Sequence, residues 1–441
     1  MEEVHRRLLI KQNPWWQNLE VETPEFERDL LEDLNKAEKH KQIVAVTGLR
    51  RVGKTVLMKQ MIKRLLEGTP KENVCYISFD DIDFQKYRIA EELMNYFLEY
   101  SDEKQMRYLF LDELQKLENF ADLLKTIYDT EKNLKMHVSG SSSLDLRKQK
   151  ETLAGRILTY HLPPLTFSEY ARYFRLKHAV DSGNLIREYE LKMMPDKGRY
   201  RMLFKDYLKK GAFPELLGEE DEEYIKKYIK ESVVDKTISD IAKITGENEQ
   251  ILHELFRLLA GSNAQLFENT NLANTLKTNR NKITQYISLL EKAYLIKVAY
   301  NYTTSVTKQV RSSRKQYNAH SSITLATLDY PLQAVETKEV AGHLVEATIA
   351  NHHSKISFWR TPHEEVDIII ETNGKPTPIE VKYQNTPTKD DQKGLLSFCK
   401  KHKTKRAILV TEDTLKEEET QGVKVTQTPA WLHLLTKTTQ Q

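Results

Sequence analysis

The chain has 441 residues, of which 39% are hydrophobic and 30% are charged. One hydrophobic core seldom serves more than about 300 residues, so this length predicts two or three folded domains. The 67 basic and 64 acidic residues leave a formal charge of only +3. This balance excludes a strong attraction of the whole molecule to polyanions, so any contact with nucleic acid must come from a local patch.

The two cysteines, Cys75 and Cys399, are too few for a disulfide framework, and neither belongs to a CxxC metal pair. We expect free thiols in a reducing compartment. The N-terminal run MEEVHRRLLIKQNPWW has no continuous apolar stretch and is unlike a signal peptide. No segment approaches the ~20 apolar residues that a membrane helix needs. The sequence therefore predicts a cytoplasmic protein without a membrane partner.

Strands and helices alternate in the first third of the chain. Apolar runs typical of buried strands lie at residues 42–48, 73–81, 107–113 and 135–141, and residues 55–68, 90–101 and 120–133 have helical periodicity. Continuous apolar strands joined by helices predict a parallel sheet that is covered on both faces. We predict an α/β domain over residues 1–170, including an N-terminal extension.

A phosphate-binding motif lies between the first strand and its helix. The run GLRRVGKT satisfies the pattern GxxxxGK[ST]. Backbone N–H groups of such a loop attract phosphates, while Lys54 would reach the outer phosphates and the Thr55 hydroxyl would ligate Mg²⁺. The sequence therefore predicts a site for ATP and Mg²⁺ made of Gly48, Leu49, Arg50, Arg51, Val52, Gly53, Lys54, Thr55 and Val56.

Two acids end the strand RYLFLDE, at the edge where parallel sheets bind ligands. Asp112 would hold Mg²⁺ through water, and Glu113 would orient and activate the attacking water, so the site is predicted to hydrolyse ATP. The next strand ends in a serine cluster, in which Ser141 is the first candidate and Ser139 the second for contact with the γ-phosphate or the water. A turn that only caps the following helix is an equal alternative.

Arg156 lies in the short turn ETLAGRI. A guanidinium suits the charge that develops on the γ-phosphate, so Arg156 is a candidate arginine finger, directed toward a neighbouring subunit of a homo-oligomer. A surface ion pair is the alternative.

Residues 171–245 have the pattern of a helical lid or connector, and residues 246–330 have the element order of a winged helix. Its recognition helix would present Asn279, Thr284 and Tyr286 together with the DNA-contact candidates, and the run RSSRK would add basic residues near the wing. The DNA-binding candidates are Arg280, Asn281, Lys282, Gln285, Arg311, Arg314 and Lys315. Packing against the ATPase domain or another protein is the alternative role of this module.

Residues 331–441 carry an acid pattern typical of metal-dependent phosphodiesterases. Asp367 in one strand and Glu380 in the next would hold Mg²⁺, helical Glu346 would complete the metal site, and Lys382 would assist the attacking water. This order resembles the PD-(D/E)xK nuclease superfamily, with Val366 at the position of the PD proline. The alternative to a metal site is an ordinary solvated strand face, on which Glu and Lys commonly alternate.

Several motifs together resemble the AAA-type ATPases that carry a C-terminal DUF4143 domain in archaea and bacteria. They are NPWW, GLRRVGKT, LFLDELQ, VSGSSS, LAGRI followed by LPPLTFSEY, and KGAFPE. The resemblance covers nearly the whole chain and implies an ASCE-type P-loop core, a helical region, a winged helix and a nuclease-like end. It supports Arg156 as a finger, because Arg156 matches the family's GR position. The family's strand that ends in an aspartate is matched here by KQYNAHSSI, which lacks the acid.

The sequence thus predicts an ATP-driven protein that acts on DNA, with a C-terminal unit that grips or cuts it. One alternative is a nucleotide-controlled switch whose C-terminal unit only binds. Another is an ATPase beside an endonuclease that works independently of it.

Overall fold

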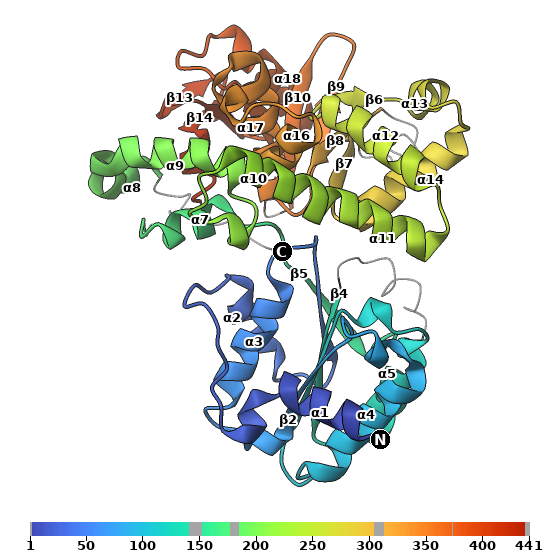
Figure 1. Ribbon diagram of the computed structural model, residues 1–441. Helices are drawn as coiled ribbons and strands as arrows, with labels where there is room; N and C mark the ends of the chain where they lie inside the picture. Colours follow the sequence, from blue (N-terminus) through green and yellow to red (C-terminus); the bar gives the residue numbers. More distant parts are fainter. Residues whose placement is uncertain (1, 141–151, 177–184, 304–312, 373, 437–441) are drawn as a thin grey trace. The chain divides into compact units, whose positions relative to one another are not determined.

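The computed structural model describes residues 2–140, 152–176, 185–303, 313–372 and 374–436. The chain divides into two compact units, Met1–Pro163 and Pro164–Gln441 (Figure 1). The first unit ends seven residues before the predicted boundary at residue 170, and the predicted boundaries at residues 245 and 330 fall inside the second unit.

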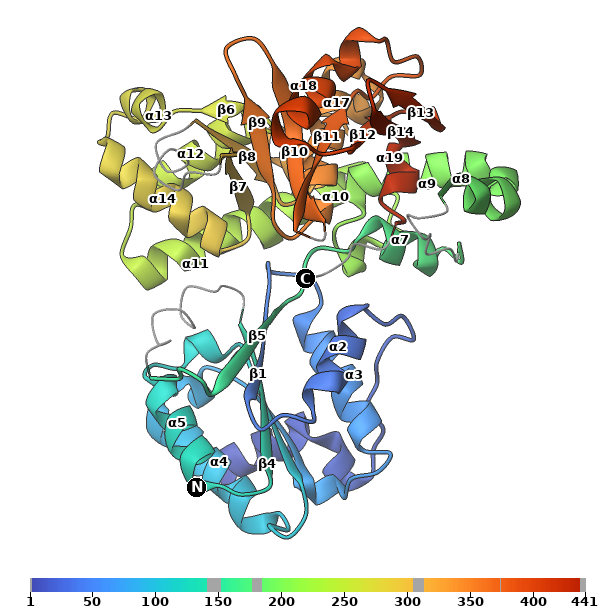
Figure 2. The ribbon, with the colours of Figure 1, turned by 180° about the vertical axis from the view of Figure 1, so that it is seen from behind.

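The first unit is built on a five-stranded, wholly parallel sheet of order β2-β3-β4-β1-β5. The strands are β1 (Ile43–Thr47), β2 (Val74–Ser78), β3 (Arg107–Asp112), β4 (Leu134–Gly140) and β5 (Ile157–His161). Helices α2 (Leu30–Ala37) and α3 (Lys54–Leu65) cover one face, and α4 (Tyr87–Tyr100) and α5 (Phe120–Thr130) cover the other, as Figures 1 and 2 show. The predicted parallel α/β core is confirmed.

The NPWW segment covers the edge strand β2. It follows helix α1 (Glu3–Gln12), and Asn13 exchanges two hydrogen bonds with the backbone of Tyr76. The indole N–H groups of Trp15 and Trp16 both donate to the carbonyl of Val74 at 2.9 Å. These contacts satisfy backbone groups that an exposed edge strand would leave free to pair with another chain.

The second unit contains a mixed nine-stranded sheet of order β13-β14-β12-β11-β10-β9-β7-β8-β6. Its strands are β6 (Leu266–Phe267), β7 (Ile296–Asn301), β8 (Arg314–Asn318), β9 (Ser357–Arg360), β10 (Glu365–Thr372), β11 (Lys375–Val381), β12 (Arg406–Thr411), β13 (Lys416–Thr420) and β14 (Val423–Pro429). Strands of the predicted winged-helix region and of the predicted nuclease-like region therefore share one sheet, joined where β7 pairs with β9.

Helices surround this sheet (Figure 2). They are α7 (Phe167–Tyr173), α8 (Leu185–Glu188), α9 (Lys197–Lys210), α10 (Glu222–Lys227), α11 (Lys236–Thr245), α12 (Glu249–Gly261), α13 (Asn269–Thr275), α14 (Arg280–Lys292), α16 (Ser321–Thr327), α17 (Lys338–His352), α18 (Lys393–His402) and α19 (Ala430–His433). All regular elements described between residues 171 and 245 are helical, as predicted. The order α12-β6-α13-α14-β7-β8 is that expected of a winged helix, whose identity stays a prediction.

Candidate functional site

The phosphate loop lies between β1 and α3. At its two glycine positions, Gly48 and Gly53, the backbone does not accommodate a larger residue without strain. A Cβ atom on Gly48 would lie 2.3 Å from the carbonyl oxygen of Leu162. Gly53 has a φ of 97°, a left-handed conformation that side chains oppose. The buried guanidinium of Arg28 donates to the carbonyls of Val52 at 2.7 Å and of Pro163 at 2.8 Å. Arg28 therefore holds the loop in place.

Lys54 opens helix α3 and is buried within the loop. Its ammonium donates to the carbonyl oxygens of Gly48 at 3.1 Å and of Leu49 at 3.0 Å. Burial lowers the pKa of Lys54, and the nearby Glu113 and Asp112 carboxylates oppose that shift. A positive group held at the N-terminus of a helix is suited to bind phosphate.

Asp112, at the end of β3, is the centre of a buried hydrogen-bond network. Its Oδ2 accepts from the Thr55 hydroxyl and from the Tyr76 hydroxyl, both at 2.7 Å, and its Oδ1 accepts from the Ser139 hydroxyl. Burial and the adjacent Asp112 raise the pKa of Tyr76. The network brings together Thr55 and Asp112 as the motif predicted, and it adds Tyr76, which the sequence analysis missed.

Glu113 follows directly, with a φ of 55° that few non-glycine residues adopt. Its backbone N–H donates to the Ser139 hydroxyl at 3.1 Å, and the side-chain amide of Gln115 donates to its carboxylate. The left-handed turn and these two bonds set the direction of the Glu113 carboxylate. Ser141, the first candidate of the serine cluster, lies outside the described residues; Ser139 lies beside both acids.

These residues fit ATP and Mg²⁺. The glycine loop provides backbone N–H groups and a helix N-terminus for phosphates. The Thr55 hydroxyl and the Asp112 carboxylate, 2.7 Å apart, are the hard oxygen donors that Mg²⁺ prefers.

Arg156 forms a two-pronged ion pair within its own chain. Its Nε and Nη2 donate to the two carboxylate oxygens of Asp129 at 2.9 and 3.0 Å. The hydrogen bonds from Arg156 lower the pKa of Asp129. This contact matches the ion-pair alternative, and the role of finger toward another subunit stays a prediction.

A second cluster of charged residues lies in the second unit, where Glu346 of α17, Asp367 of β10 and Glu380 of β11 are all buried. The Asp367 N–H donates to Glu380 Oε2 at 3.3 Å, and Asp367 Oδ2 accepts from the Val381 N–H at 3.0 Å. The Lys382 ammonium donates to Glu380 Oε1. The structure thus brings together the four residues predicted for the nuclease-like site.

Lys315 also belongs to this cluster, which we call the acid centre: Lys315, Glu346, Glu365, Asp367, Glu380 and Lys382. The Lys315 ammonium lies 3.2 Å from Glu346, 2.7 Å from Glu365 and 3.3 Å from Asp367. Only 4% of its side chain is exposed. The prediction that Lys315 lies in an exposed wing and grips DNA is therefore wrong: it is an inward-facing residue of β8 with its charge neutralised by acids.

Burial and electrostatic repulsion dominate the acid centre. Burial and the neighbouring Asp367 raise the pKa of Glu346 to about 8, and the same causes raise that of Glu380. Burial opposes the charge of Lys315, but Glu346 and Asp367 outweigh it and raise the pKa of Lys315 far above its usual value. Among the described residues, no group of three or more acidic, histidine or cysteine side chains has the arrangement of a metal site.

His320 lies in the stretch KQYNAHSSI, which lacks the aspartate of the family pattern. Its Nδ1 accepts the N–H of Ser322 at 3.1 Å and so caps helix α16, which is a role that a carboxylate also performs. Burial lowers the pKa of His320 to about 3, so the ring is neutral at physiological pH.

The exposed face of α14 carries some of the predicted DNA contacts. Arg280, Asn281 and Gln285 are exposed, whereas Lys282 is ion-paired with Glu247. The prediction that Tyr286 lies on the exposed side is wrong, since it is buried among Ile283, Ile287 and Leu290.

Of the predicted wing residues, Arg314 packs its guanidinium 5.4 Å above the ring of Phe267. Arg311 lies outside the described residues. This region therefore offers exposed polar groups for a nucleic acid but a smaller basic patch than the sequence predicts.

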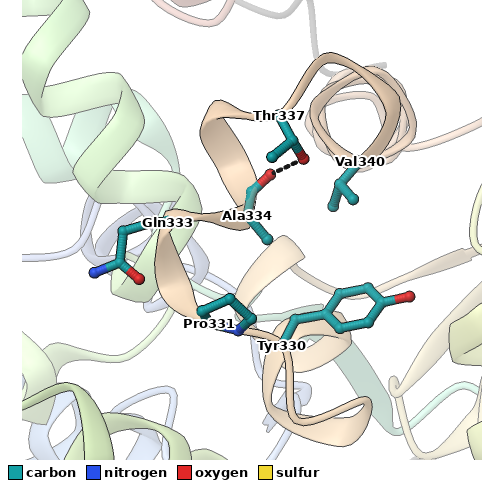
Figure 3. A pocket seen from close by; sticks show the side chains of 6 residues that line it. All are labelled: Tyr330, Pro331, Gln333, Ala334, Thr337 and Val340. Carbon is teal, nitrogen blue, oxygen red and sulfur yellow. Dashed lines mark hydrogen bonds between the residues drawn. The ribbon is translucent and has the colours of Figure 1, made fainter.

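A hollow near the N-terminus of α17 is apolar (Figure 3). It is lined by Tyr330, Pro331, Gln333, Ala334, Thr337 and Val340, and the Thr337 hydroxyl donates to the Ala334 carbonyl at 2.8 Å. No charged side chain lines it, so it lacks the groups that bind phosphate or metal.

Comparison with family models gives three matches along the chain. Residues 40–171 match the AAA domain, residues 201–333 match a domain of unknown function, DUF8612, and residues 333–431 match another, DUF4143. No helix within the described part of the chain has the length and hydropathy to cross a membrane.

Curated relatives are uncharacterised. A protein of Methanocaldococcus jannaschii is 29% identical over 315 residues, which are 67% of this chain and 64% of that protein. A protein of Haemophilus influenzae is 22% identical over 400 residues, covering 88% of this chain and 94% of its own length. This chain thus spans a little under two thirds of the first relative.

Solved structures with similarity include the Orc1 protein of Aeropyrum pernix in complex with DNA, with 13% identity, a TM-score of 0.31 and coverage of 72% of this chain and 96% of that one. Cdc6p of Pyrobaculum aerophilum has 12% identity, a TM-score of 0.29 and coverage of 73% and 97%. Scores this low support no conclusion about fold or function.

Proposed function

Residues 40–171 of this chain belong to the AAA domain family and residues 333–431 to the DUF4143 family, and from this premise we propose that the chain binds ATP with Mg²⁺ and hydrolyses it. The observation that carries the proposal is the 2.7 Å contact between the Thr55 hydroxyl and the Asp112 carboxylate at the end of the phosphate loop. A loop that only capped a helix would not need this contact between the first turn of α3 and the end of β3.

Each residue of the first unit has a distinct task in this proposal. Lys54 neutralises charge on the outer phosphates, and the loop N–H groups orient them. Thr55 and Asp112 hold Mg²⁺, which when bound supplies positive charge between the phosphates. Glu113, directed by Gln115 and by its turn, accepts a proton from the attacking water, and Ser139 keeps the two acids in register. Ser141 is a further candidate for contact with the γ-phosphate.

We propose that the active form is a homo-oligomer in which Arg156 contacts the nucleotide of a neighbouring subunit. A guanidinium at that position would stabilise the charge of the transition state. The partner Asp129 is exposed on the same surface and would release Arg156 when subunits meet.

DNA is the partner we propose, contacted by the face of α14 that carries Arg280, Asn281 and Gln285. Arg311 and Arg314 stay candidates from the sequence alone. The three α14 residues are exposed and of types that bind phosphates and base edges. Lys282 would contribute only after leaving Glu247. The two buried free thiols fit a cytoplasmic location.

Two functions of the acid centre follow from its residues. A metal-dependent nuclease would need Asp367, Glu380 and Glu346 to hold Mg²⁺ while Lys382 assists the attack. In a nucleotide-controlled switch, the second unit would only bind a partner and would not cleave it. The ion pairs of Lys315 with Glu346 and Asp367 favour the switch, because they occupy oxygens that a metal would need.

ATP turnover with and without DNA tests the proposal. Phosphate release should require Lys54, and single-stranded, duplex or branched DNA should raise it in the unaltered chain. Arg280→Ala should weaken the stimulation by DNA and make that stimulation less dependent on salt concentration. Arg257→Ala, which removes an exposed arginine from α12, should change neither. No turnover under any condition would refute hydrolysis, and turnover indifferent to all three DNAs would leave the switch as the function.

A further inference from the structure

The acid centre does not fit the divalent metal that its motif implies. The order of helical Glu346, strand Asp367 and strand Glu380 matches the pattern of metal-dependent nucleases, yet each of these carboxylates already meets a donor from the protein.

Lys315 is surrounded by acids: it donates hydrogen bonds to Glu346 and Asp367 and forms an ion pair with Glu365. A lysine ammonium has three N–H donors, and three carboxylate oxygens surround this one, from Glu346, Glu365 and Asp367, at 3.2, 2.7 and 3.3 Å. Lys315 lies in β8, so its position is fixed by a strand inside the sheet. Tyr317, two residues along the same strand and therefore on the same face, donates to Glu346 at 3.2 Å and to the Asp367 carbonyl at 3.3 Å.

The other oxygens of Asp367 and Glu380 are also engaged. Asp367 Oδ2 accepts the Val381 N–H, and the two oxygens of Glu380 accept from Lys382 and from the Asp367 N–H. A divalent ion would therefore have to displace an ammonium and break charge-assisted hydrogen bonds, which are the strong ones in a buried site.

We propose that Lys315 is the permanent counter-cation of the acid centre, so that the centre binds no divalent metal in the unaltered chain, and that removal of the Lys315 charge creates a metal site. This inference deepens the proposed role of the second unit as a binding module and does not depend on ATP hydrolysis. Removal of one partner of such a buried set leaves uncompensated charge, which supplies the driving force for a metal to enter.

Binding of Mn²⁺ to the full chain without nucleotide, followed by the electron paramagnetic resonance of the free ion, tests the proposal. All variants carry Asp112→Asn, which removes the metal ligand of the ATP site. The chain with Asp112→Asn alone is the reference, and adding Asp367→Asn to it should not change its Mn²⁺ binding. Addition of Lys315→Met, which keeps the apolar stem, should give one bound Mn²⁺ per chain, and further addition of Asp367→Asn should abolish it.

Two controls separate charge from a general effect. Lys315→Arg keeps a cation and should gain no site. Lys355→Met removes an exposed lysine of the same unit and should also gain none.

The proposal is overturned if the reference binds one Mn²⁺ that is lost with Asp367→Asn, or if folded Lys315→Met binds none. The comparison of the reference with its Asp367→Asn partner decides the matter even if Lys315→Met does not fold. Since none of these readings involves ATP turnover or DNA, failure here is distinguishable from failure of the proposed function.

Discussion

Replacement of Gly48 by alanine should disable the phosphate loop through a single methyl group. The added Cβ would lie 2.3 Å from the Leu162 carbonyl oxygen, about 1 Å closer than a normal contact. That oxygen belongs to backbone and cannot rotate away, and the Leu162 N–H is itself bonded to the Thr47 carbonyl at 2.7 Å. Either the loop or the chain after β5 must move.

We expect Gly48→Ala to cost about 1–3 kcal/mol of stability in the first unit, the usual range for overpacking. Displacement of the loop should also weaken ATP binding by at least about 10-fold, since a tenfold change needs only about 1.4 kcal/mol. Fluorescent ATP-analogue binding and denaturant unfolding measure the two effects. Gly68→Ala is the matched control, because no atom lies within 4 Å of its added Cβ. Unchanged affinity and stability in Gly48→Ala would refute the packing account of the loop.

Three further outcomes are expected. His320→Asn keeps a helix cap but removes a ring whose pKa is about 6.5 in the unfolded chain and about 3 in the folded one. The parent should therefore lose about 2 kcal/mol of stability between neutral pH and pH 5 that the variant does not lose. An equal dependence of the free energy of opening of α16 on pH in both proteins, measured by hydrogen exchange, contradicts this. Tyr76→Phe should lower the free energy of unfolding by about 1–3 kcal/mol, because the buried Asp112 loses a donor at 2.7 Å; denaturant melts that coincide with the parent's would disprove it. Arg156→Ala should lower kcat by about 10³-fold while Asp129→Asn leaves it near normal, whereas equal losses would assign Arg156 to the ion pair alone.

The first unit was predictable because its signals are local. Continuous apolar runs fixed the parallel strands, and the spacing of Gly48, Gly53, Lys54 and Thr55 placed the phosphate loop between a strand and a helix. The contact of Thr55 with Asp112 followed from the rule that ligands bind at the carboxyl ends of strands. Arg28 and Tyr76 had no such signal, since their roles depend on contacts far away in the sequence.

The second unit was harder to predict because its key contacts are not local. Lys315 stands in the basic run RSSRK, which has the composition of a DNA-binding wing, while its three acids come from residues 346–367. Lys315 and Tyr317 are two residues apart in one strand and therefore lie on the same face. A large aromatic residue at that spacing was a weak sign that the Lys315 side chain points inward. Tyr286 could have been placed correctly, since Ile283, Tyr286, Ile287 and Leu290 follow the helical spacing of a buried face.

The central claim is that the first unit hydrolyses ATP through the Asp112–Glu113 pair. Release of phosphate from γ-labelled ATP under single-turnover conditions, in the parent and in Glu113→Gln, tests it most directly. We expect the parent to release phosphate and the variant to bind ATP equally well while releasing it about 10²–10⁴-fold more slowly, since it lacks the proton acceptor. Equal rates in the two proteins, or no release by the parent, would contradict the account.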